Sequence, residues 1–301
     1  MKIVIVGAGS IGLLLGSYLS EMGHDLYFLT RREEQAKTLR TKGITRVMPN
    51  KQEIVVRVDA TTHVQHLPKD ALWICAVKYH HLEDTKRILQ HTSSDTPLLF
   101  IQNGLGHLKW MGQLENKRLY IGTIEHGAMK QNDWTVLHKG IGSLNLAPLY
   151  PTEENHEEIF SSTYENFPVV WGNDAHFLVL RKTILNACIN PLTALLQIKN
   201  GDLVKNTNAA NLLQKVYEEI MSVFPEMKPH ITLKVVQQLC EKTGENYSSM
   251  LQDMQQGKKT EIETIAGSLL QVANERQKEI PTLATIYKLI CAIEESGVKR
   301  E

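Results

Sequence analysis

The chain opens with a short apolar strand pattern that runs directly into a glycine-rich turn. Gly7, Gly9 and Gly12 follow residues 2–6 in the spacing GxGxxG, and a helical pattern over residues 11–22 starts inside the motif. In such a motif the first glycine allows a tight turn, the second lets the backbone approach a pyrophosphate, and the third lets the helix pack closely on the strand. The helix N-terminus favours an anion. The pattern predicts a dinucleotide-binding βαβ unit, against the alternative of a glycine-rich turn without a ligand. Its expected cofactor contacts are Gly7, Ala8, Gly9, Ser10, Ile11 and Gly12.

The residues at the tip of the second expected strand, residues 26–29, indicate which dinucleotide is bound. An NAD site usually has an Asp or Glu there to accept a hydrogen bond from the ribose 2′-hydroxyl. This chain reads Thr30-Arg31-Arg32 instead. A guanidinium grips a 2′-phosphate with two hydrogen bonds, whereas a carboxylate would repel it. We therefore predict NADP(H), with Arg31 as the ligand. The alternative is that both arginines are solvated residues that open the next helix.

The periodicity of apolar residues divides the chain into two parts. Residues 1–171 alternate between strand and helix patterns, which is typical of a parallel sheet with crossover helices. The expected strands are residues 3–6, 26–29, 72–77, 98–101, 119–129, 135–138, 143–147 and 169–171, and the expected helices are 11–22, 33–42 and 82–90. The glycine-rich residues 139–142 suggest a hairpin-like turn. Residues 172–301 carry amphipathic helical patterns at 176–196, 211–224, 232–242, 261–278 and 282–295. The predicted fold class is an α/β N-terminal Rossmann-type dinucleotide-binding domain, residues 1–171, followed by an all-α C-terminal domain, residues 172–301.

Composition and charge argue against several classes of protein. The 301 residues include 33 basic and 33 acidic side chains, and this balance argues against a protein that coats nucleic acid or a membrane surface. The four cysteines lie far apart without a CxxC pair, so we expect free thiols in a reducing compartment. The histidines form no HxH or HExxH pattern, and we expect no metal. A strand pattern starts almost at Met1, and no apolar run approaches the roughly 20 residues of a membrane span. We therefore expect a cytoplasmic protein.

Two polar residues follow expected strands of the sheet. Lys78 ends the sequence Ala76-Val77-Lys78, and Asn103 lies in Gln102-Asn103-Gly104. In an open parallel sheet, ligands bind beyond the carboxyl ends of the strands. Both side chains are therefore expected to reach the cofactor or the substrate, although each could instead be an ordinary polar loop residue.

A polar stripe crosses an otherwise apolar helix in the second half of the chain. Lys182, Asn186 and Asn190 are spaced by four residues, so they share one helix face. Burying such a stripe without partners is costly, which favours a wet cleft facing a ligand over the alternative of a narrow solvent-facing stripe. Pro191 is expected to end or kink this helix.

A second polar patch comprises residues 246–250 and 259–263. Thr260 and Glu263 fit the spacing of a capping box, which predicts Glu261 as the first helical residue. On spacing alone, Glu261 is then a carboxylate that complements the helix dipole.

Taken together, these blocks resemble the ketopantoate reductase (2-dehydropantoate 2-reductase) family along the whole chain. The resemblance is carried by the glycine turn, Ala76-Val77-Lys78, Gln102-Asn103-Gly104, Lys182 through Asn186 to Asn190-Pro191-Leu192-Thr193-Ala194, Asn200-Gly201, and residues 248–253 leading into Thr260-Glu261-Ile262. It implies an N-terminal Rossmann domain that binds NADPH and a helical C-terminal domain of the 6-phosphogluconate dehydrogenase C-terminal type. It also implies the reduction of ketopantoate to (R)-pantoate, a step of pantothenate and coenzyme A biosynthesis.

The resemblance assigns roles to individual residues. It implies that Lys182 is the general acid, that Glu261 is a catalytic or positioning glutamate, that Arg31 holds the 2′-phosphate, and that Lys78 is a cofactor-side lysine. The implied substrate-binding positions are Asn103, Lys182, Asn186, Asn190, Asn200, Asn246 and Ser249, of which Asn103 also lies on the cofactor side. The chain departs from many family members at Glu125-His126, where they carry small or hydroxyl residues near the nicotinamide.

Two other functions remain open from the sequence. One is a related NADP-dependent 2-oxoacid or β-hydroxyacid reductase with a different substrate, because sequence cannot decide the last details of a pocket. The other is a non-catalytic NADP(H)-sensing protein, which would not need Lys182, Asn186 and Glu261 together. The apolar face around residues 286–293 could pack internally or against a second subunit, so we expect a monomer or a homodimer that acts on a small-molecule keto acid.

Overall fold

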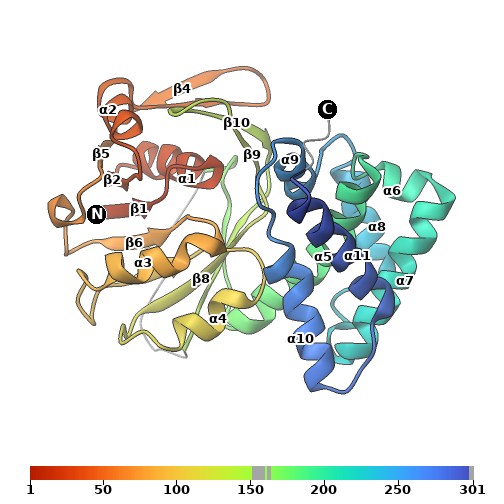
Figure 1. The fold of residues 1–301 in the computed structure, drawn as a ribbon. Coiled ribbons are helices and arrows are strands. Elements are labelled where there is room, and N and C mark those ends of the chain that lie inside the picture. Colours follow the sequence, from red (N-terminus) through yellow and green to blue (C-terminus); the bar gives the residue numbers. More distant parts are fainter. Residues whose placement is uncertain (151–159, 161–163, 298–301) are drawn as a thin grey trace. The chain divides into compact units, whose positions relative to one another are not determined.

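The chain forms two compact units in a computed structural model, which describes residues 1–150, 160 and 164–297 (Figure 1). Unit 1 comprises Met1–Gln102 and Lys109–Leu178, and unit 2 comprises Asn103–Leu108 and Val179–Glu301. The short segment Asn103–Leu108 thus belongs to unit 2, although the chain on both sides of it belongs to unit 1. The sequence did not indicate this arrangement.

Unit 1 is built on a large, mostly parallel sheet. Its strands are β1 (Lys2–Val6), β2 (Asp25–Leu29), β5 (Asp59–Thr61), β6 (Leu72–Cys75), β7 (Leu98–Phe100), β8 (Leu119–Ile124), β11 (Leu144–Pro148) and β12 (Val169–Trp171). They lie in the order β12-β11-β8-β7-β6-β1-β2-β5. Ile3, Val4 and Ile5 of β1 are fully buried, as expected for a central strand covered on both faces. From β5 to β8 the strands follow the doubly wound order, in which a ligand binds where the order reverses, next to β1.

The described residues of unit 1 form helices at the three places that the apolar periodicity predicted, and one further helix over residues 106–111 that it did not predict. They are α1 (Ser10–Glu21), α2 (Glu33–Lys42), α3 (Leu82–Leu89) and α4 (Gly106–Met111, whose first residues belong to unit 2), with short 3₁₀ turns η1 (Val64–His66) and η2 (Tyr79–His81). The α1 helix is buried from Gly12 to Leu19. It lies between the large sheet and a second, smaller sheet (Figure 1).

The second sheet was not anticipated from the sequence. It contains β3 (Ile44–Val47), β4 (Glu53–Val56), β9 (Gly127–Lys130) and β10 (Thr135–Gly140) in the order β4-β3-β10-β9. The single strand expected over residues 119–129 is therefore two strands, β8 and β9, in different sheets. The expected hairpin-like turn at residues 139–142 is wrong, because β10 and β11 also lie in different sheets.

The two connections between these sheets run alongside each other, which explains the error. Glu125 N donates to Ser143 O at 2.8 Å, and Gly142 N donates to His126 Nδ1 at 3.2 Å. A Cβ on Gly142 would lie 2.4 Å from Glu125 O. Gly142 thus allows two chain segments to pass closely between the sheets, and residues 139–142 do not form a tight hairpin.

A polar cluster is buried between α1 and the second sheet. The Arg46 guanidinium lies 3.5 Å from the centre of the Tyr18 ring and forms a 2.5 Å ion pair with Glu21. Tyr18 Oη lies 2.9 Å from His138 Nδ1, and His138 Nε2 lies 3.1 Å from His126 Nδ1. Burial, together with the nearby Arg46 charge, lowers the pKa of His138 to about 4. The His126 of the departing Glu125-His126 pair is therefore part of the packed interior of unit 1.

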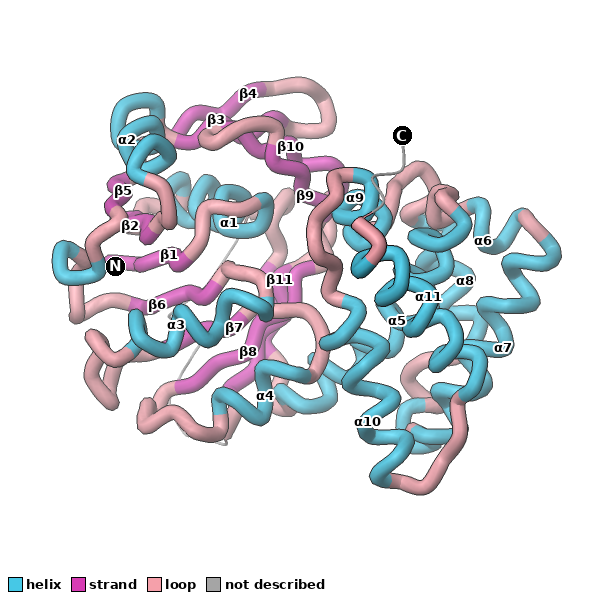
Figure 2. Tube along the Cα trace, viewed as in Figure 1, coloured by secondary structure: helices cyan, strands magenta, loops and turns pink. Residues whose placement is uncertain are grey.

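The described part of unit 2 consists of helices joined by loops, with no strand (Figure 2). The elements are α5 (Ala175–Leu196, in unit 2 from Val179), α6 (Asp202–Lys205), α7 (Thr207–Val223), η4 (Pro225–Met227), α8 (Leu233–Lys242), α9 (Ser249–Gln255), the π-helix η5 (Glu263–Gly267), α10 (Ser268–Glu275) and α11 (Pro281–Glu295). Amphipathic spacing accounts for the longer ones: Leu213, Val216 and Ile220 of α7 are fully buried. Pro191 does not end its helix, which was one of the two expected outcomes, because α5 continues to Leu196. None of the helices in the described ranges is long and apolar enough to cross a membrane.

Candidate active site

The glycine turn of unit 1 has the shape of an anion cradle. Gly7 has a φ of +104°, and a Cβ on Gly12 would lie 2.0 Å from Gly7 O, so both positions require glycine. Gly9, by contrast, is exposed, and a Cβ there would meet nothing within 4 Å. Within the described residues, no side chain caps the start of α1, and its first turn contains no acid. The exposed Gly9 and the start of α1 therefore fit the pyrophosphate of a dinucleotide.

Residues of α2 and of the second sheet form hydrogen bonds with this turn. Gln35 Nε2 donates to Ala8 O at 3.0 Å, and Lys130 N donates to Ser10 Oγ at 3.2 Å. Lys130 Nζ lies 3.4 Å from Ala8 O. Sequence reasoning missed both residues, because no local pattern shows that the side chain of Gln35 on α2 reaches the turn or that β9, with Lys130, passes it.

The two arginines after β2 differ in their surroundings. Arg32 forms a 2.5 Å ion pair with Asp133, whose carboxylate also lies 2.9 Å from Lys130 Nζ. Burial alone would raise the pKa of Asp133, but the hydrogen bonds from Lys130 and Arg32 lower it below its usual value. Arg31 is exposed and forms no ion pair with any residue that the structure describes.

Lys78 follows β6 at the same edge of the sheet as the glycine turn. A Cβ on Gly7 would lie 2.8 Å from Val77 Cγ1, so the two segments touch. Gln102 Nε2 donates to the carbonyls of Cys75 and Val77 at 2.8 and 2.9 Å, which ties the end of β7 to the end of β6. Lys78 itself is half-buried.

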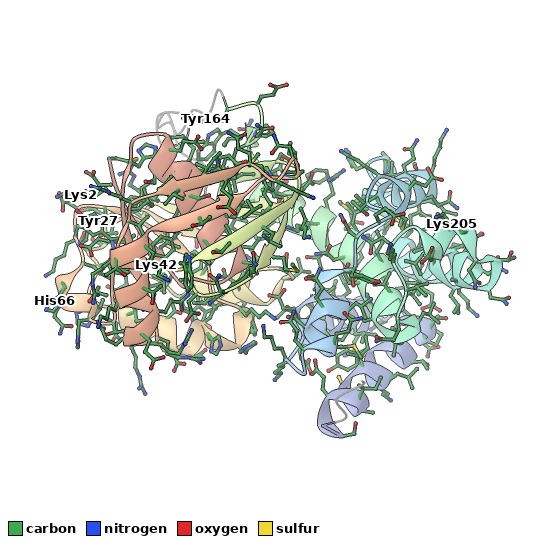
Figure 3. All side chains as sticks on the ribbon, turned by 90° about the horizontal axis from the view of Figure 1, so that it is seen from above. Lys2, Tyr27, Lys42, His66, Tyr164 and Lys205 are labelled. Carbon is green, nitrogen blue, oxygen red and sulfur yellow. The ribbon has the colours of Figure 1, made fainter. Side chains whose placement is uncertain are left out.

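A small pocket of unit 1 lies apart from these residues. It has a volume of about 200 Å³ and is lined by Tyr27, Arg40, Asp59, Ala60, Thr61, His66 and Leu67. Tyr27 and His66 are labelled in Figure 3. Because none of the expected site residues lines it, this pocket does not serve as the candidate site.

The remaining expected site residues all belong to unit 2, including Asn103. Asn103 Nδ2 donates to Glu261 Oε2 at 2.7 Å. Both side chains are partly exposed. Two residues that lie 158 positions apart in the sequence are thus brought into direct contact.

The polar stripe of α5 lies at the margin of the helical core. Lys182 and Asn186 are half-buried, and Asn190 is only 8% exposed. The burial of Asn190 does not fit a stripe that faces solvent along its whole length. One turn further on, Thr193 Oγ1 lies 2.7 Å from Ser248 Oγ, which caps α9 by accepting from Leu251 N.

This link places Ser249 and the loop before it beside α5. Ser249 is exposed and is the first residue of α9. Asn200 N donates to Asn246 O at 3.0 Å, and Asn200 Nδ2 donates to Thr243 Oγ1 at 2.9 Å. The Asn200 Nδ2 group is therefore used within this loop contact, whereas Asn200 Oδ1 is buried without a hydrogen-bond partner among the described residues; Asn246 is half-buried.

The expected capping box at Thr260 is not formed. Glu263 Oε1 accepts from the Tyr287 hydroxyl at 2.7 Å, and the Thr260 N–H donates to Glu294 instead, also at 2.7 Å. Thr260 Oγ1 accepts from Ile262 N at 3.2 Å, whereas a capping box would use the N–H of Glu263. The reason is that α11 supplies competing partners for both members of the box.

Comparison with known proteins covers both parts of the chain. Residues 3–150 match the family model described as "Ketopantoate reductase PanE/ApbA", and residues 177–294 match its C-terminal counterpart. The chain belongs to the ketopantoate reductase family. A 2-dehydropantoate 2-reductase of Bacillus subtilis (strain 168) is 35% identical, with 99% of each chain covered. One of Listeria monocytogenes is also 35% identical, over 98% of this chain and 97% of that protein.

Solved structures agree with membership of the ketopantoate reductase family. The crystal structure of a probable 2-dehydropantoate 2-reductase from Bacillus subtilis superposes with a TM-score of 0.86 at 34% identity, covering 98% of this chain and 100% of that one. A D-mandelate dehydrogenase with NADH and anilino(oxo)acetate has a TM-score of 0.84 at 23% identity, covering 99% of each chain, and shows the shared fold. The predicted family and fold class are thereby confirmed. Among the described residues, no group of His, Cys, Asp and Glu side chains could hold a metal ion.

Proposed function

We propose that this protein reduces ketopantoate to (R)-pantoate with NADPH, a step of pantothenate and coenzyme A biosynthesis. Full-length relatives at 35% identity carry the name 2-dehydropantoate 2-reductase. The observation that carries the proposal is the 2.7 Å hydrogen bond between Asn103 and Glu261. It joins two positions that the family resemblance assigns to the keto-acid site.

We place the cofactor contacts in residues 1–171 and the keto-acid contacts in residues 172–301. Asn103 is added to the keto-acid contacts. The exposed backbone at Gly9 and the N-terminus of α1 would hold the pyrophosphate of NADP(H), together with the other residues of the turn. Arg31 would hold the 2′-phosphate, because it is exposed while Arg32 is engaged by Asp133. Lys78 would approach the cofactor from the end of β6.

The proposed chemistry needs one proton donor and several orienting groups. NADPH, when bound, would supply the hydride for the C2 ketone. Negative charge then develops on the carbonyl oxygen, and the Lys182 ammonium group would stabilise this charge and donate a proton to the oxygen. Glu261, held by Asn103, would orient the lysine or the forming hydroxyl. Asn186, Asn190, Asn246 and Ser249 would bind the hydroxyl and carboxylate of the substrate, with Asn200 shaping the adjoining loop.

One alternative substrate class is supported by a specific observation. The same fold, at a TM-score of 0.84, occurs in a D-mandelate dehydrogenase. The fold therefore accommodates 2-oxo acids of different shape, and a related 2-oxoacid reductase is the second candidate function. An NADP(H) sensor without catalysis is the outcome that remains if neither activity is present.

A substrate panel tests these functions directly. NADPH oxidation is followed at 340 nm with ketopantoate, pyruvate, phenylglyoxylate or no keto acid, and each reaction is repeated with NADH. The proposal predicts the highest kcat/KM with ketopantoate and NADPH. Preference for phenylglyoxylate would favour the second candidate, and tight NADPH binding without any turnover would favour the sensor.

We further propose a cytoplasmic enzyme that is a monomer or a homodimer and has no nucleic-acid or membrane partner. The four cysteines are free, and three of them are buried, as suits a reducing compartment. On α11, Ile286 and Ile290 are buried inside unit 2 while Leu289 is half-exposed. Cell fractionation tests the compartment, and light scattering of the purified protein at several concentrations tests the oligomeric state.

A further inference from the structure

The short segment Asn103–Leu108 is docked on the helix that follows Glu261. Leu105 N donates to Thr264 O at 3.0 Å, and the same carbonyl accepts from Ser268 Oγ at 2.6 Å. Thr264 lies in the π-helix η5, where the wider turn breaks the regular α-helical pattern. A carbonyl in the body of a helix is thereby used to hold a segment from a distant part of the chain.

The contact is made between two backbones, without side chains that could give way. Gly104 has a φ of +81°, which favours glycine. A Cβ on Gly104 would lie 2.0 Å from Thr264 O and 2.3 Å from Thr264 C. Any larger residue must therefore push the segment away from η5.

The helix side of this contact is braced from α11. Tyr287 Oη donates to Glu263 Oε1 at 2.7 Å, and Glu294 Oε1 accepts from Thr260 N at 2.7 Å. The two bonds are made by Glu263 and Thr260, which follow and precede Glu261 in the sequence. Thr264 Oγ1 also donates to Glu261 O at 3.2 Å, which connects the docked turn to the backbone of the glutamate itself.

We infer that the contact of Gly104 with Thr264, braced by Tyr287, is a positioning device that sets the Asn103–Glu261 hydrogen bond. Asn103 is the direct neighbour of Gly104, and Glu261 lies one turn before Thr264. A displacement of the contact is therefore passed to both members of the pair. The inference rests on the proposed function only for its kinetic consequence, since the geometry is independent of the substrate.

The first test is Gly104→Ala. Its kcat/KM for ketopantoate should fall by roughly 10- to 100-fold, the effect of misplacing one hydrogen bond to a charged group. An unchanged kcat/KM would overturn the inference.

Gly43→Ala is the matched control. Gly43 has a φ of +71°, and a Cβ there would lie 2.1 Å from Val56 O, so the local strain is similar. It lies in unit 1, outside every residue group assigned to the site. Similar losses of thermal stability with a kinetic loss only in Gly104→Ala would support positioning, whereas equal kinetic losses in both variants would contradict it.

A second variant covers the case in which Gly104→Ala does not fold. Tyr287→Phe removes the hydroxyl donor to Glu263 and keeps the ring, and its kcat/KM should fall by roughly 3- to 30-fold. Tyr217→Phe, which removes the hydroxyl that donates from α7 to Ile231 O in the loop before α8, should leave kcat/KM unchanged. Equal effects of the two changes would count against a role for the brace.

A double-mutant cycle separates this inference from the proposed function. The coupling between Asn103→Ala and Glu261→Gln is measured in the free energy of unfolding, in the wild-type background and again with Gly104→Ala or Tyr287→Phe present. Coupling that is lost in either background supports the inference even if no keto acid is reduced. Coupling that persists unchanged in both overturns it, whatever the activity.

Discussion

At the scale of single residues, Lys182 is the group on which the proposed chemistry depends. It is half-buried on α5 and shares a face with Asn186 and Asn190. We expect Lys182→Ala to lower kcat by about 100-fold or more, because a positioned proton donor typically contributes that much. Steady-state NADPH oxidation with ketopantoate measures the effect. The exposed Lys234 on α8 offers a control, since Lys234→Ala should retain wild-type turnover; near-normal turnover of Lys182→Ala would remove it from the acid role.

Arg31 governs the choice of cofactor in the same proposal. Arg31→Ala removes the guanidinium expected on the 2′-phosphate, so KM for NADPH should rise by roughly 10- to 100-fold while KM for NADH stays nearly constant. Arg32→Ala should change this ratio much less, because Arg32 is engaged by Asp133. Equal changes of both KM values in Arg31→Ala would show that Arg31 does not contact the 2′-phosphate.

The hydrogen-bond partners of individual residues could not be predicted from the local sequence pattern. The spacing of Thr260 and Glu263 suggested that they bond to each other, but Tyr287 and Glu294 of α11 take their places. The proximity of Asn103 to Glu261 follows from the docking of Asn103–Leu108 in unit 2, which no local pattern encodes. The individual roles of these residues stay predictions.

At the scale of elements, the glycine turn contains one glycine that the packing requires, Gly12, and one that we propose faces the cofactor, Gly9. Gly12→Ala places a methyl group 2.0 Å from Gly7 O and should lower the free energy of unfolding by about 1–3 kcal/mol. Gly9→Ala meets nothing within 4 Å and should change stability by less than about 0.5 kcal/mol. Its methyl group would nevertheless occupy the cradle, so the Kd for NADPH should rise about 10-fold.

Urea unfolding and NADPH titration of the two variants check this pair of expectations. The reverse pattern, with a destabilised Gly9→Ala variant that still binds NADPH normally, would show that the open space at Gly9 is not the cofactor cradle.

Elements with a long apolar pattern could be predicted, and short alternating ones could not. The strands β1, β2, β6 and β7 follow apolar runs and were expected within two residues of their observed bounds. The β4 strand was missed because its residues alternate with an exposed face, as Val55 at 62% exposure shows. The division between β8 and β9 was missed because only the two residues Glu125 and His126 separate the apolar residues of β8 from those of β9.

At the scale of the whole molecule, each unit contains a buried histidine with a strongly lowered pKa. Burial lowers the pKa of His107 in unit 2 to about 4, and burial with the Arg46 charge does the same for His138 in unit 1. In the unfolded chain a histidine has a pKa of about 6.5. Between pH 6.5 and 4 the unfolded chain therefore binds more protons than the folded one, and stability falls as the pH falls.

We therefore expect full stability above pH 6.5 and a loss of about 2 kcal/mol per histidine by pH 5. Urea unfolding at pH 7.5, 6 and 5 measures the trend. His138→Gln should flatten the pH dependence of unit 1, with exposed His91→Gln as a control that leaves it unchanged. Stability that does not change, or rises, on acidification through this window would refute the assignment of neutral buried histidines.

The path of the chain through the two units has a consequence for exchanging parts between relatives. Asn103–Leu108 is encoded in the first half of the gene and falls inside the match over residues 3–150, yet it packs with the second half. A chimera joined near residue 175 would pair one parent's Gly104 and Asn103 with the other parent's Thr264 and Glu261. Exchange of the C-terminal half should therefore succeed only when residues 103–108 are exchanged with it, so the unit to exchange is discontinuous in the gene of this protein.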